Sequence, residues 1–244
     1  MRLGNVVIKV LRKEASKRAF NGSLLILGKR DELCEESFFQ SLGFSRVTHL
    51  DPSELDLDQD HLSQKFKGSF DLILDFSALE HVFHLPNALR NIWKMLRDEG
   101  RIIHLLASAN HVDHGFYMFS PSLFWEFYHV NQFQNHSMQI LRETNKKRTP
   151  WEVYDYEPGC LGRISFGGLD HKRYIVSCIA QKSSNSTGHI IPQQQEYEMK
   201  NCKTVKYQNL KRNSEKFPKF YKLFKGIAKK MLMGPLGLKL SARY

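Results

Sequence analysis

The sequence has 244 residues, 41% of them hydrophobic, which is long enough for one α/β domain with additional segments. Its four cysteines are far apart and show no C-x-x-C spacing, which argues against a disulfide framework or a metal–thiolate site and favours a reducing, cytoplasmic location. No apolar run approaches the ~20 residues of a membrane span, and we expect no secretory signal.

Positive charge is concentrated at the C-terminal end. The formal net charge is +11, and residues 186–244 contain 13 Lys and Arg against three Asp and Glu. The rest of the chain is therefore nearly neutral. Such a basic segment is either a solvated surface or a segment attracted to phosphates or anionic lipid.

The first predicted element is a basic helix within residues 1–22. One side of it is apolar: Val6, Val7, Val10 and Leu11. The main α/β domain is expected over residues 23–182. It begins with an apolar strand over residues 23–27, which ends at Gly28.

The next elements complete a strand, helix, strand unit. Asp31 is a suitable N-cap for a helix that Gly43 closes. A strand over residues 47–50 follows and ends at Asp51. This order predicts parallel pairing. Residues 51–69 are too acidic for a normal strand, so we expect one strand of the sheet to be shortened there.

A second such unit runs from residue 69 to residue 106. Two short buried strands are expected over 70–74 and 102–106, joined by a helix that begins at Pro86 and stops at Gly100. The apolar side of this helix recurs at i, i+3, i+4 and i+7: Leu89, Ile92, Trp93 and Leu96. Two parallel strands with a crossover helix form a βαβ unit.

The remainder of the domain is expected to close the sheet. Ser120-Pro121 opens a helix through Val130, and residues 138–141 and 174–180 read as two strands of an antiparallel edge. Between them, an aromatic and glycine-containing segment over residues 151–162 is expected to be irregular and to cover the active site.

A polar linker and a basic tail follow the domain. Residues 183–198 read as the linker, and residues 199–244 form the tail. Within the tail, aromatic and aliphatic residues between Phe217 and Leu232 fall on one helical side, with lysines on the rest. This pattern predicts a basic amphipathic helix.

The segment Phe70–Val82, FDLILDFSALEHV, together with NALRNIWKMLRDEGRIIHL, resembles the second half of the class I S-adenosylmethionine (SAM)-dependent methyltransferases. The later stretch DHGFYMFSP, residues 113–121, resembles a subgroup with a D-H-G-F-Y-x-F-S-P segment. The resemblance covers residues 24–128. It implies a three-layer, Rossmann-like sheet, mostly parallel with an antiparallel edge, and SAM as the cofactor.

Candidate cofactor-binding residues follow from the ends of the strands. An acidic residue after the second strand can accept hydrogen bonds from both ribose hydroxyls, and Asp51 holds that position. The first turn keeps only Gly28 of the family's G-x-G-x-G, and Lys29 follows as a partner for the carboxylate of SAM. The loop Asp75-Phe76-Ser77 is expected beside the cofactor, with Phe76 packing against it.

Two histidines are the candidate catalytic residues. The resemblance places His81, in the sequence LEHV, near the transferred methyl group. His114 follows the last parallel strand, where the acceptor would meet the cofactor, and an imidazole is a suitable general base near neutral pH. No metal ligands are expected.

These observations predict methyl transfer from SAM to an oxygen or nitrogen of a small molecule or saccharide. Because the first turn carries two cations in place of glycines, a non-catalytic scaffold of the same fold remains an alternative. The basic tail leaves open an RNA methyltransferase, a peripheral contact with the inner membrane face, or packing of the tail on the domain.

Overall fold

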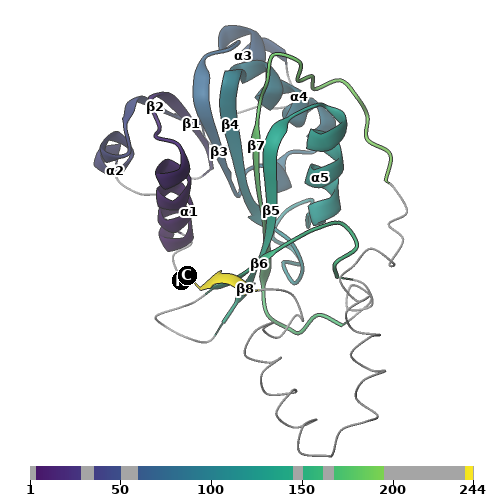
Figure 1. Ribbon diagram of the computed structural model, residues 1–244. Helices are drawn as coiled ribbons and strands as arrows, with labels where there is room; N and C mark the ends of the chain where they lie inside the picture. The colour runs from purple at the N-terminus through teal and green to yellow at the C-terminus, as the bar shows by residue number, and fades with distance from the viewer. Residues whose placement is uncertain are drawn as a thin grey trace, which may run out of the picture.

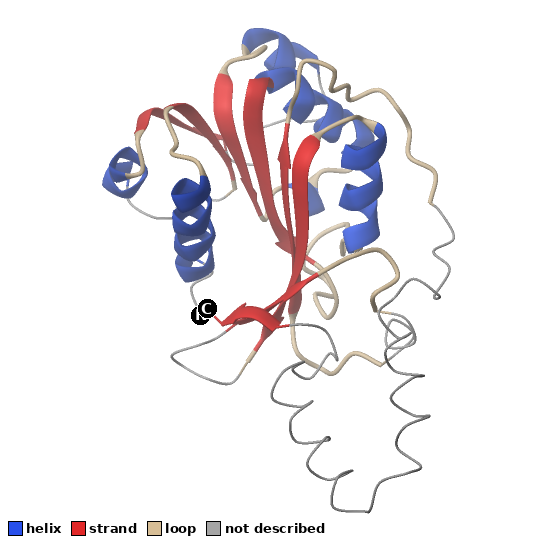
Figure 2. Cartoon of the chain, viewed as in Figure 1, coloured by secondary structure: helices blue, strands red, loops and turns tan. Residues whose placement is uncertain are grey.

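The computed structural model describes residues 4–28, 36–50, 60–144, 151–161, 168–194 and 240–243. One eight-stranded sheet runs through the described residues in the order β2-β1-β3-β4-β7-β5-β6-β8 (Figures 1 and 2). Its strands are β1 (Gly22–Leu27), β2 (Phe44–Leu50), β3 (Phe70–Phe76), β4 (Leu96–Ala107), β5 (Gln134–Glu143), β6 (Trp151–Asp155), β7 (Tyr174–Gln181) and β8 (Leu240–Arg243). The helices are α1 (Gly4–Lys17), α2 (Glu36–Ser41), α3 (Asp60–Lys65), α4 (Leu85–Met95) and α5 (Pro121–Val130), with a 3-10 turn η2 (Leu79–His81).

The direction of the strands confirms the expected fold class. Strands β2, β1, β3 and β4 pair in parallel. Strand β7 is antiparallel to both β4 and β5, so it lies inserted between two strands that share a direction. The antiparallel edge expected from residues 138–141 and 174–180 is therefore confirmed, and β6 and β8 extend it.

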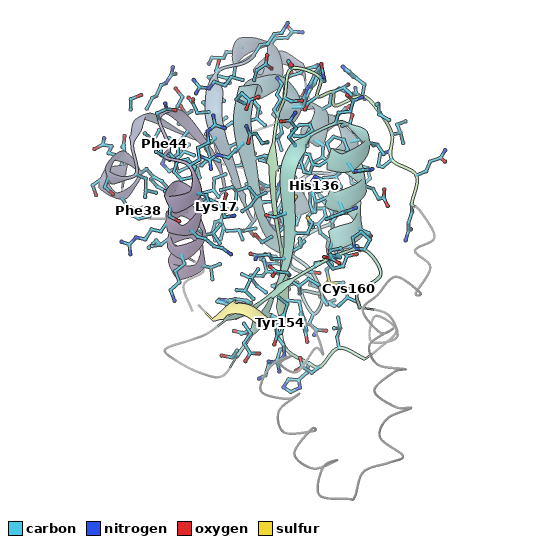
Figure 3. The ribbon with its side chains drawn as sticks, viewed as in Figure 1. Lys17, Phe38, Phe44, His136, Tyr154 and Cys160 are labelled. Carbon is cyan, nitrogen blue, oxygen red and sulfur yellow. The ribbon has the colours of Figure 1, made fainter. Side chains whose placement is uncertain are left out.

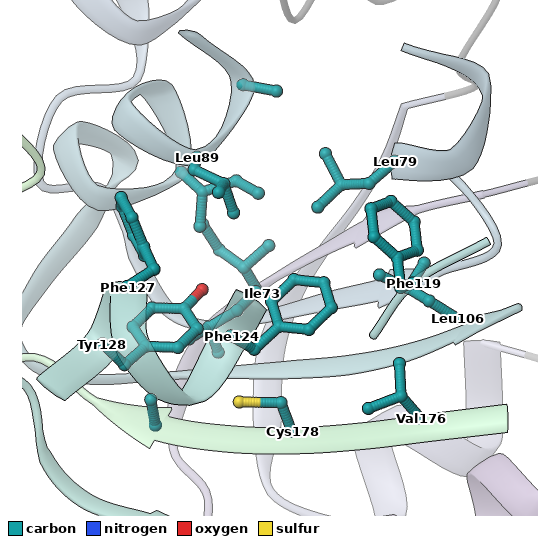
Figure 4. Close-up of a cluster of buried hydrophobic side chains, with 14 of the residues drawn as sticks. Ile73, Leu79, Leu89, Leu106, Phe119, Phe124, Phe127, Tyr128, Val176 and Cys178 are labelled. Carbon is teal, nitrogen blue, oxygen red and sulfur yellow. The ribbon is translucent and has the colours of Figure 1, made fainter. Parts of the chain in front are cut away.

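Helices cover both faces of the sheet because the side chains of its strands alternate between two apolar clusters. Leu25 and Ile73 join the cluster under α4 and α5, whereas Leu24 and Leu72 join the cluster under α1 and α2. Figure 4 shows the first cluster, in which the aromatic side chains of α5 lie over β4 and β7. The expected apolar side of α1 is buried in the second. The result is a three-layer domain.

The start of β4 differs from the prediction. Helix α4 ends at Met95, and Gly100 lies inside β4 instead of capping a helix. The left-handed residue is Glu99, with φ 63°. A Cβ on Gly100 would lie 2.8 Å from the carbonyl oxygen of Arg97 and 3.0 Å from that of Phe70. Glycine is therefore required here by a close backbone approach, not by a positive φ.

The aromatic segment after residue 150 also differs from the prediction. Its first part is strand β6, in which Trp151 and Tyr154 are fully buried. Tyr154 is labelled in Figure 3. Because β6 pairs with β5 along its length, these residues extend the sheet and do not cover a site. Residues 162–167 lie outside the described part of the chain.

The described part of the predicted linker contacts the domain. The indole N–H of Trp93 donates to the carbonyl of Ser186 at 2.9 Å, and Asn131 exchanges two hydrogen bonds with the backbone of Ile190. The amphipathic tail pattern over residues 217–232 lies outside the described residues. Among the described helices, none is long and apolar enough to cross a membrane.

Candidate active site

The candidate site lies where the strand order reverses, at the carboxyl ends of β1 and β3. From β1 the chain goes to β2 on one side, and β3 and β4 lie on the other. In open α/β sheets this reversal leaves a crevice that binds ligands. Gly28 follows β1 with φ 144°, and Ser77 follows β3 with φ 56°, so the extended backbone ends at these two residues.

Gly28, at the end of β1, contacts the ends of β2 and β3. Its N–H donates to the carbonyl of Leu50 at the end of β2, at 3.3 Å. A Cβ on Gly28 would overlap the carbonyl oxygen of Phe76 at the end of β3. Glycine is thus needed for close packing of the backbone at this edge, in addition to the cofactor role that the sequence predicts. Lys29 and Asp51 lie outside the described residues.

Asp75 and Phe76 do not face the edge where a cofactor is expected. Strand β3 continues through Phe76, two residues beyond the predicted end, so the two side chains point into opposite core layers. Phe76 is buried in the cluster under α1 and α2. The expected packing of the Phe76 ring against the cofactor stays a prediction, and in this structure the ring contacts the core.

Asp75 instead begins a buried chain of polar contacts. Its Oδ2 lies 2.6 Å from Nδ1 of His104, and Nε2 of His104 lies 2.6 Å from the hydroxyl of Tyr128. The other carboxylate oxygen accepts a hydrogen bond from the N–H of Ala78. Burial raises the pKa of Tyr128 well above its usual value, which keeps the hydroxyl protonated. This buried group of Asp75, His104 and Tyr128 was not predicted from the sequence, although a histidine within an apolar strand, His104, could have indicated it.

Polar side chains meet at the turn after β3. The hydroxyl of Ser77 donates to Oε1 of Glu80 at 2.5 Å and lies 3.2 Å from Nε2 of His114. The same Nε2 lies 3.5 Å from Oε1 of Glu80. Two residues that are distant in sequence, one after β3 and one after β4, are thereby brought together.

Glu80 is the buried centre of this group. Its side chain has no exposed surface, and Oε2 has no hydrogen-bond partner among the described residues. Burial raises the pKa of Glu80 to about 7, opposed by the hydrogen bond from Ser77 and reinforced by the charge of Asp75.

The loop that carries His114 is fastened to η2 through the backbone of Glu80. The amides of Phe116 and Tyr117 donate to the carbonyl of Glu80 at 2.7 and 3.4 Å. A Cβ on Gly115 would lie 2.6 Å from the same oxygen, so only glycine allows this approach. The segment that resembles D-H-G-F-Y-x-F-S-P therefore has a clear structural role.

Both candidate catalytic histidines lie at the surface of this group. The side chain of His114 is 46% exposed, and His81 is exposed as well. Their ring centroids are 5.6 Å apart. The structure thus brings Ser77, His81 and His114 together, and adds Glu80.

Residues 38–102, from α2 into β4, match a family model described as a methyltransferase domain. This segment of the chain is therefore similar in sequence to methyltransferase domains. No curated protein matches the sequence.

Solved structures that are similar to this chain include the following three. The YcgJ protein from Bacillus subtilis has 14% identity and a TM-score of 0.45, over 74% of this chain and 99% of that one. A SAM-dependent methyltransferase from Archaeoglobus fulgidus has 12% identity and a TM-score of 0.48, over 73% and 94%. The phosphoethanolamine N-methyltransferase 2 of Haemonchus contortus, in complex with phosphomonomethylethanolamine and S-adenosylhomocysteine, has 11% identity and a TM-score of 0.49, over 73% and 53%.

Proposed function

We propose that the protein transfers a methyl group from SAM to an oxygen or nitrogen of a small molecule or saccharide, at the carboxyl ends of β1 and β3. The observation that carries the proposal is the meeting of Ser77, Glu80 and His114 at this edge of a methyltransferase sheet. Polar groups that converge from two strand ends are what an acceptor with a hydroxyl or amino group needs.

The proposal that SAM binds at this edge is supported by the end of the extended backbone at both Gly28 and Ser77, which have positive φ. We place the ribose at Asp51, which directly follows the strand end that Gly28 contacts. Lys29 would pair with the carboxylate of the cofactor. When bound, SAM would supply an electrophilic methyl group on a sulfonium sulfur, and His114 would take the proton that the acceptor loses.

The protein's own part is then to hold the acceptor in line with the methyl group and to exclude water. The exposed imidazoles of His114 and His81 are placed to contact the acceptor. Ser77 fixes the position of His114, and the backbone of Glu80 fixes the loop on which His114 lies.

The test is transfer of labelled methyl from SAM to a panel of small hydroxyl, amine and saccharide acceptors, with RNA as a separate arm. We expect label on a small acceptor, and a loss of at least about tenfold in His114→Ala. The matched control is His171→Ala, a histidine in the loop before β7. Label on RNA alone, or equal rates in both variants, would contradict the proposal.

We further propose that the basic tail makes a peripheral contact with anionic membrane. Support comes from the sequence pattern alone, in which apolar and basic residues occupy different helical sides between Phe217 and Leu232. Flotation with anionic liposomes should carry the full chain upward and leave a chain without residues 213–244 behind. Equal behaviour of both would contradict the contact.

A further inference from the structure

Three side chains of metal-ligating type converge beside the candidate site. Glu80, His81 and His114 each offer one ligand atom, and these atoms all lie within 4.8 Å of one another. They come from two segments, the 3-10 turn η2 after β3 and the loop after β4. We propose that Glu80, His81 and His114 bind a divalent transition-metal cation such as Zn²⁺.

The distances suit such a cation. Ligand atoms about 2.0–2.1 Å from a tetrahedral Zn²⁺ are separated by about 3.3 Å. Oε1 of Glu80 and Nε2 of His114 are already 3.5 Å apart. The three ligand atoms all lie within 4.8 Å of one another, so binding would shorten the longest separation by about 1.5 Å or less, and the His81 side chain that takes part in it is exposed.

The carboxylate of Glu80 supplies the second, independent argument. It is fully buried, and its Oε2 lacks a partner among the described residues. A buried carboxylate oxygen without a partner is costly, and a cation at this place would offset that cost. The orphaned oxygen belongs to the same side chain whose other oxygen already faces His114.

The contacts around the three ligands are those that orient a metal site. The hydroxyl of Ser77 donates to Oε1 of Glu80 at 2.5 Å and so fixes the position of this carboxylate. The amide of Phe116 holds the Glu80 backbone at 2.7 Å. Such outer contacts keep ligands in place and raise metal affinity. Two imidazoles and one carboxylate select Zn²⁺ or a neighbouring transition metal over Mg²⁺ or Ca²⁺.

Three protein ligands leave one coordination position open, as in catalytic sites. If the proposed methyl transfer is right, this position faces the acceptor, and the cation would bind the acceptor's oxygen or nitrogen and favour loss of its proton. Only this catalytic role rests on the proposed function. Binding of the cation itself stands on the geometry of the three side chains.

The experiment is calorimetric titration of the chelator-treated full chain with ZnCl₂ near neutral pH, without SAM. We expect one Zn²⁺ per chain. Two variants each remove one proposed ligand: Glu80→Gln keeps the volume of the side chain, and His114→Ala shortens a side chain that is half exposed. Each should weaken Zn²⁺ binding by at least about tenfold. Ser77→Ala, which removes a contact to a ligand, should weaken Zn²⁺ binding by about 10–100-fold. The matched control is His84→Ala, a histidine three residues after His81 that is not in the cluster, and it should bind as the native chain does.

Substitution with Co²⁺ gives a second readout, because low-coordinate cobalt bound to these ligands absorbs visible light and hydrated cobalt absorbs far more weakly. Circular dichroism establishes that each variant is folded, and His114→Ala keeps the test valid if Glu80→Gln does not fold. Absence of saturable Zn²⁺ binding, or equal affinity in the His114→Ala variant, would overturn the inference. Titration with S-adenosylhomocysteine in parallel separates the two proposals, since Zn²⁺ binding without cofactor binding would reject only the proposed function.

Discussion

Nε2 of His104 lies 2.6 Å from the hydroxyl oxygen of Tyr128, and both side chains are buried. On the other side of the imidazole, Nδ1 lies 2.6 Å from the carboxylate of Asp75. The ring also stacks on Phe124, with centroids 4.7 Å apart. This contact chain joins β3, β4 and α5 beneath the candidate site, so it holds the strand end from which Ser77 and Glu80 extend.

Tyr128→Phe should therefore destabilise the fold. It leaves Nε2 of His104 without its partner in a buried position, and we expect a loss of about 1–3 kcal/mol in the free energy of unfolding. The measurement is urea denaturation. The control is Tyr117→Phe, which removes a hydroxyl that donates to the carbonyl of Phe83 at an exposed position and should cost about 0.5 kcal/mol or less. Equal losses in the two variants would contradict the role of the buried contact.

Gly28→Ala should be more costly than an ordinary glycine substitution in a turn. A φ of 144° lies in a region that residues other than glycine rarely adopt and costs about 1–3 kcal/mol with a side chain, and the overlap of the new Cβ with the Phe76 carbonyl adds about 1–3 kcal/mol. Gly68→Ala is the matched control, because Gly68 has φ 61° and no atom within 4 Å of its Cβ position. Urea denaturation gives the free energy of unfolding of both variants, and Gly28→Ala should lose more of it than Gly68→Ala. A similar loss in both variants would contradict a destabilising overlap between the new Cβ and the Phe76 carbonyl.

Gly115→Ala should affect methyl transfer more than cofactor binding. The new Cβ would lie 2.6 Å from the carbonyl oxygen of Glu80 and would push the His114 loop away from η2. We expect a loss of at least about tenfold in transfer rate, since small misplacements of catalytic groups are costly. The affinity for S-adenosylhomocysteine should change little. A matched loss in both quantities would place the loop at the cofactor instead of the acceptor.

Asp170 should make stability depend on acidic pH. Burial raises the pKa of its carboxyl, but hydrogen bonds from Arg142, the Lys172 amide and the Tyr174 hydroxyl outweigh this effect and lower the pKa to about 2. Because the folded pKa lies below the unfolded value, the contribution of Asp170 is present above pH ~4 and is lost as pH falls toward 2. The thermal midpoint of the native chain should fall more steeply in this range than that of Asp170→Asn. A parallel pH dependence in the two chains would contradict the assignment, and Asp98→Asn serves as the control.

The sheet could be predicted because its signals are local. Short apolar runs ending at Gly28 and Asp51, and a helix opened by Ser120-Pro121, have direct sequence signatures, and α5 has the predicted bounds. The predicted end of α4 was wrong because a glycine such as Gly100 normally marks the end of a helix. Here the glycine is required by a close approach to the Phe70 carbonyl, a tertiary contact that the sequence does not show. The same applies to β6, whose strand character depends on pairing with β5.

The site was predictable in part for the same reason. His81 and His114 were identified as candidate residues, and the structure brings them together. Asp75 and Phe76 were expected in a loop, but β3 continues through Phe76, so their side chains alternate between the two faces of the sheet and both are buried. Glu80 was missed as the centre of the group because its burial depends on the loop after β4 folding over it.

The position of the cofactor at the ends of β1 and β3 is tested most directly by calorimetric titration with S-adenosylhomocysteine. The purified native chain is compared with the Asp51→Ala variant. We expect S-adenosylhomocysteine to bind saturably at one site per chain. Removal of the Asp51 carboxylate, which we assign to the ribose hydroxyls, should weaken this binding at least about tenfold. The Asp98→Ala variant should bind as the native chain does. No binding at millimolar ligand, or unchanged affinity in Asp51→Ala, would contradict the placement of the cofactor at the ends of β1 and β3.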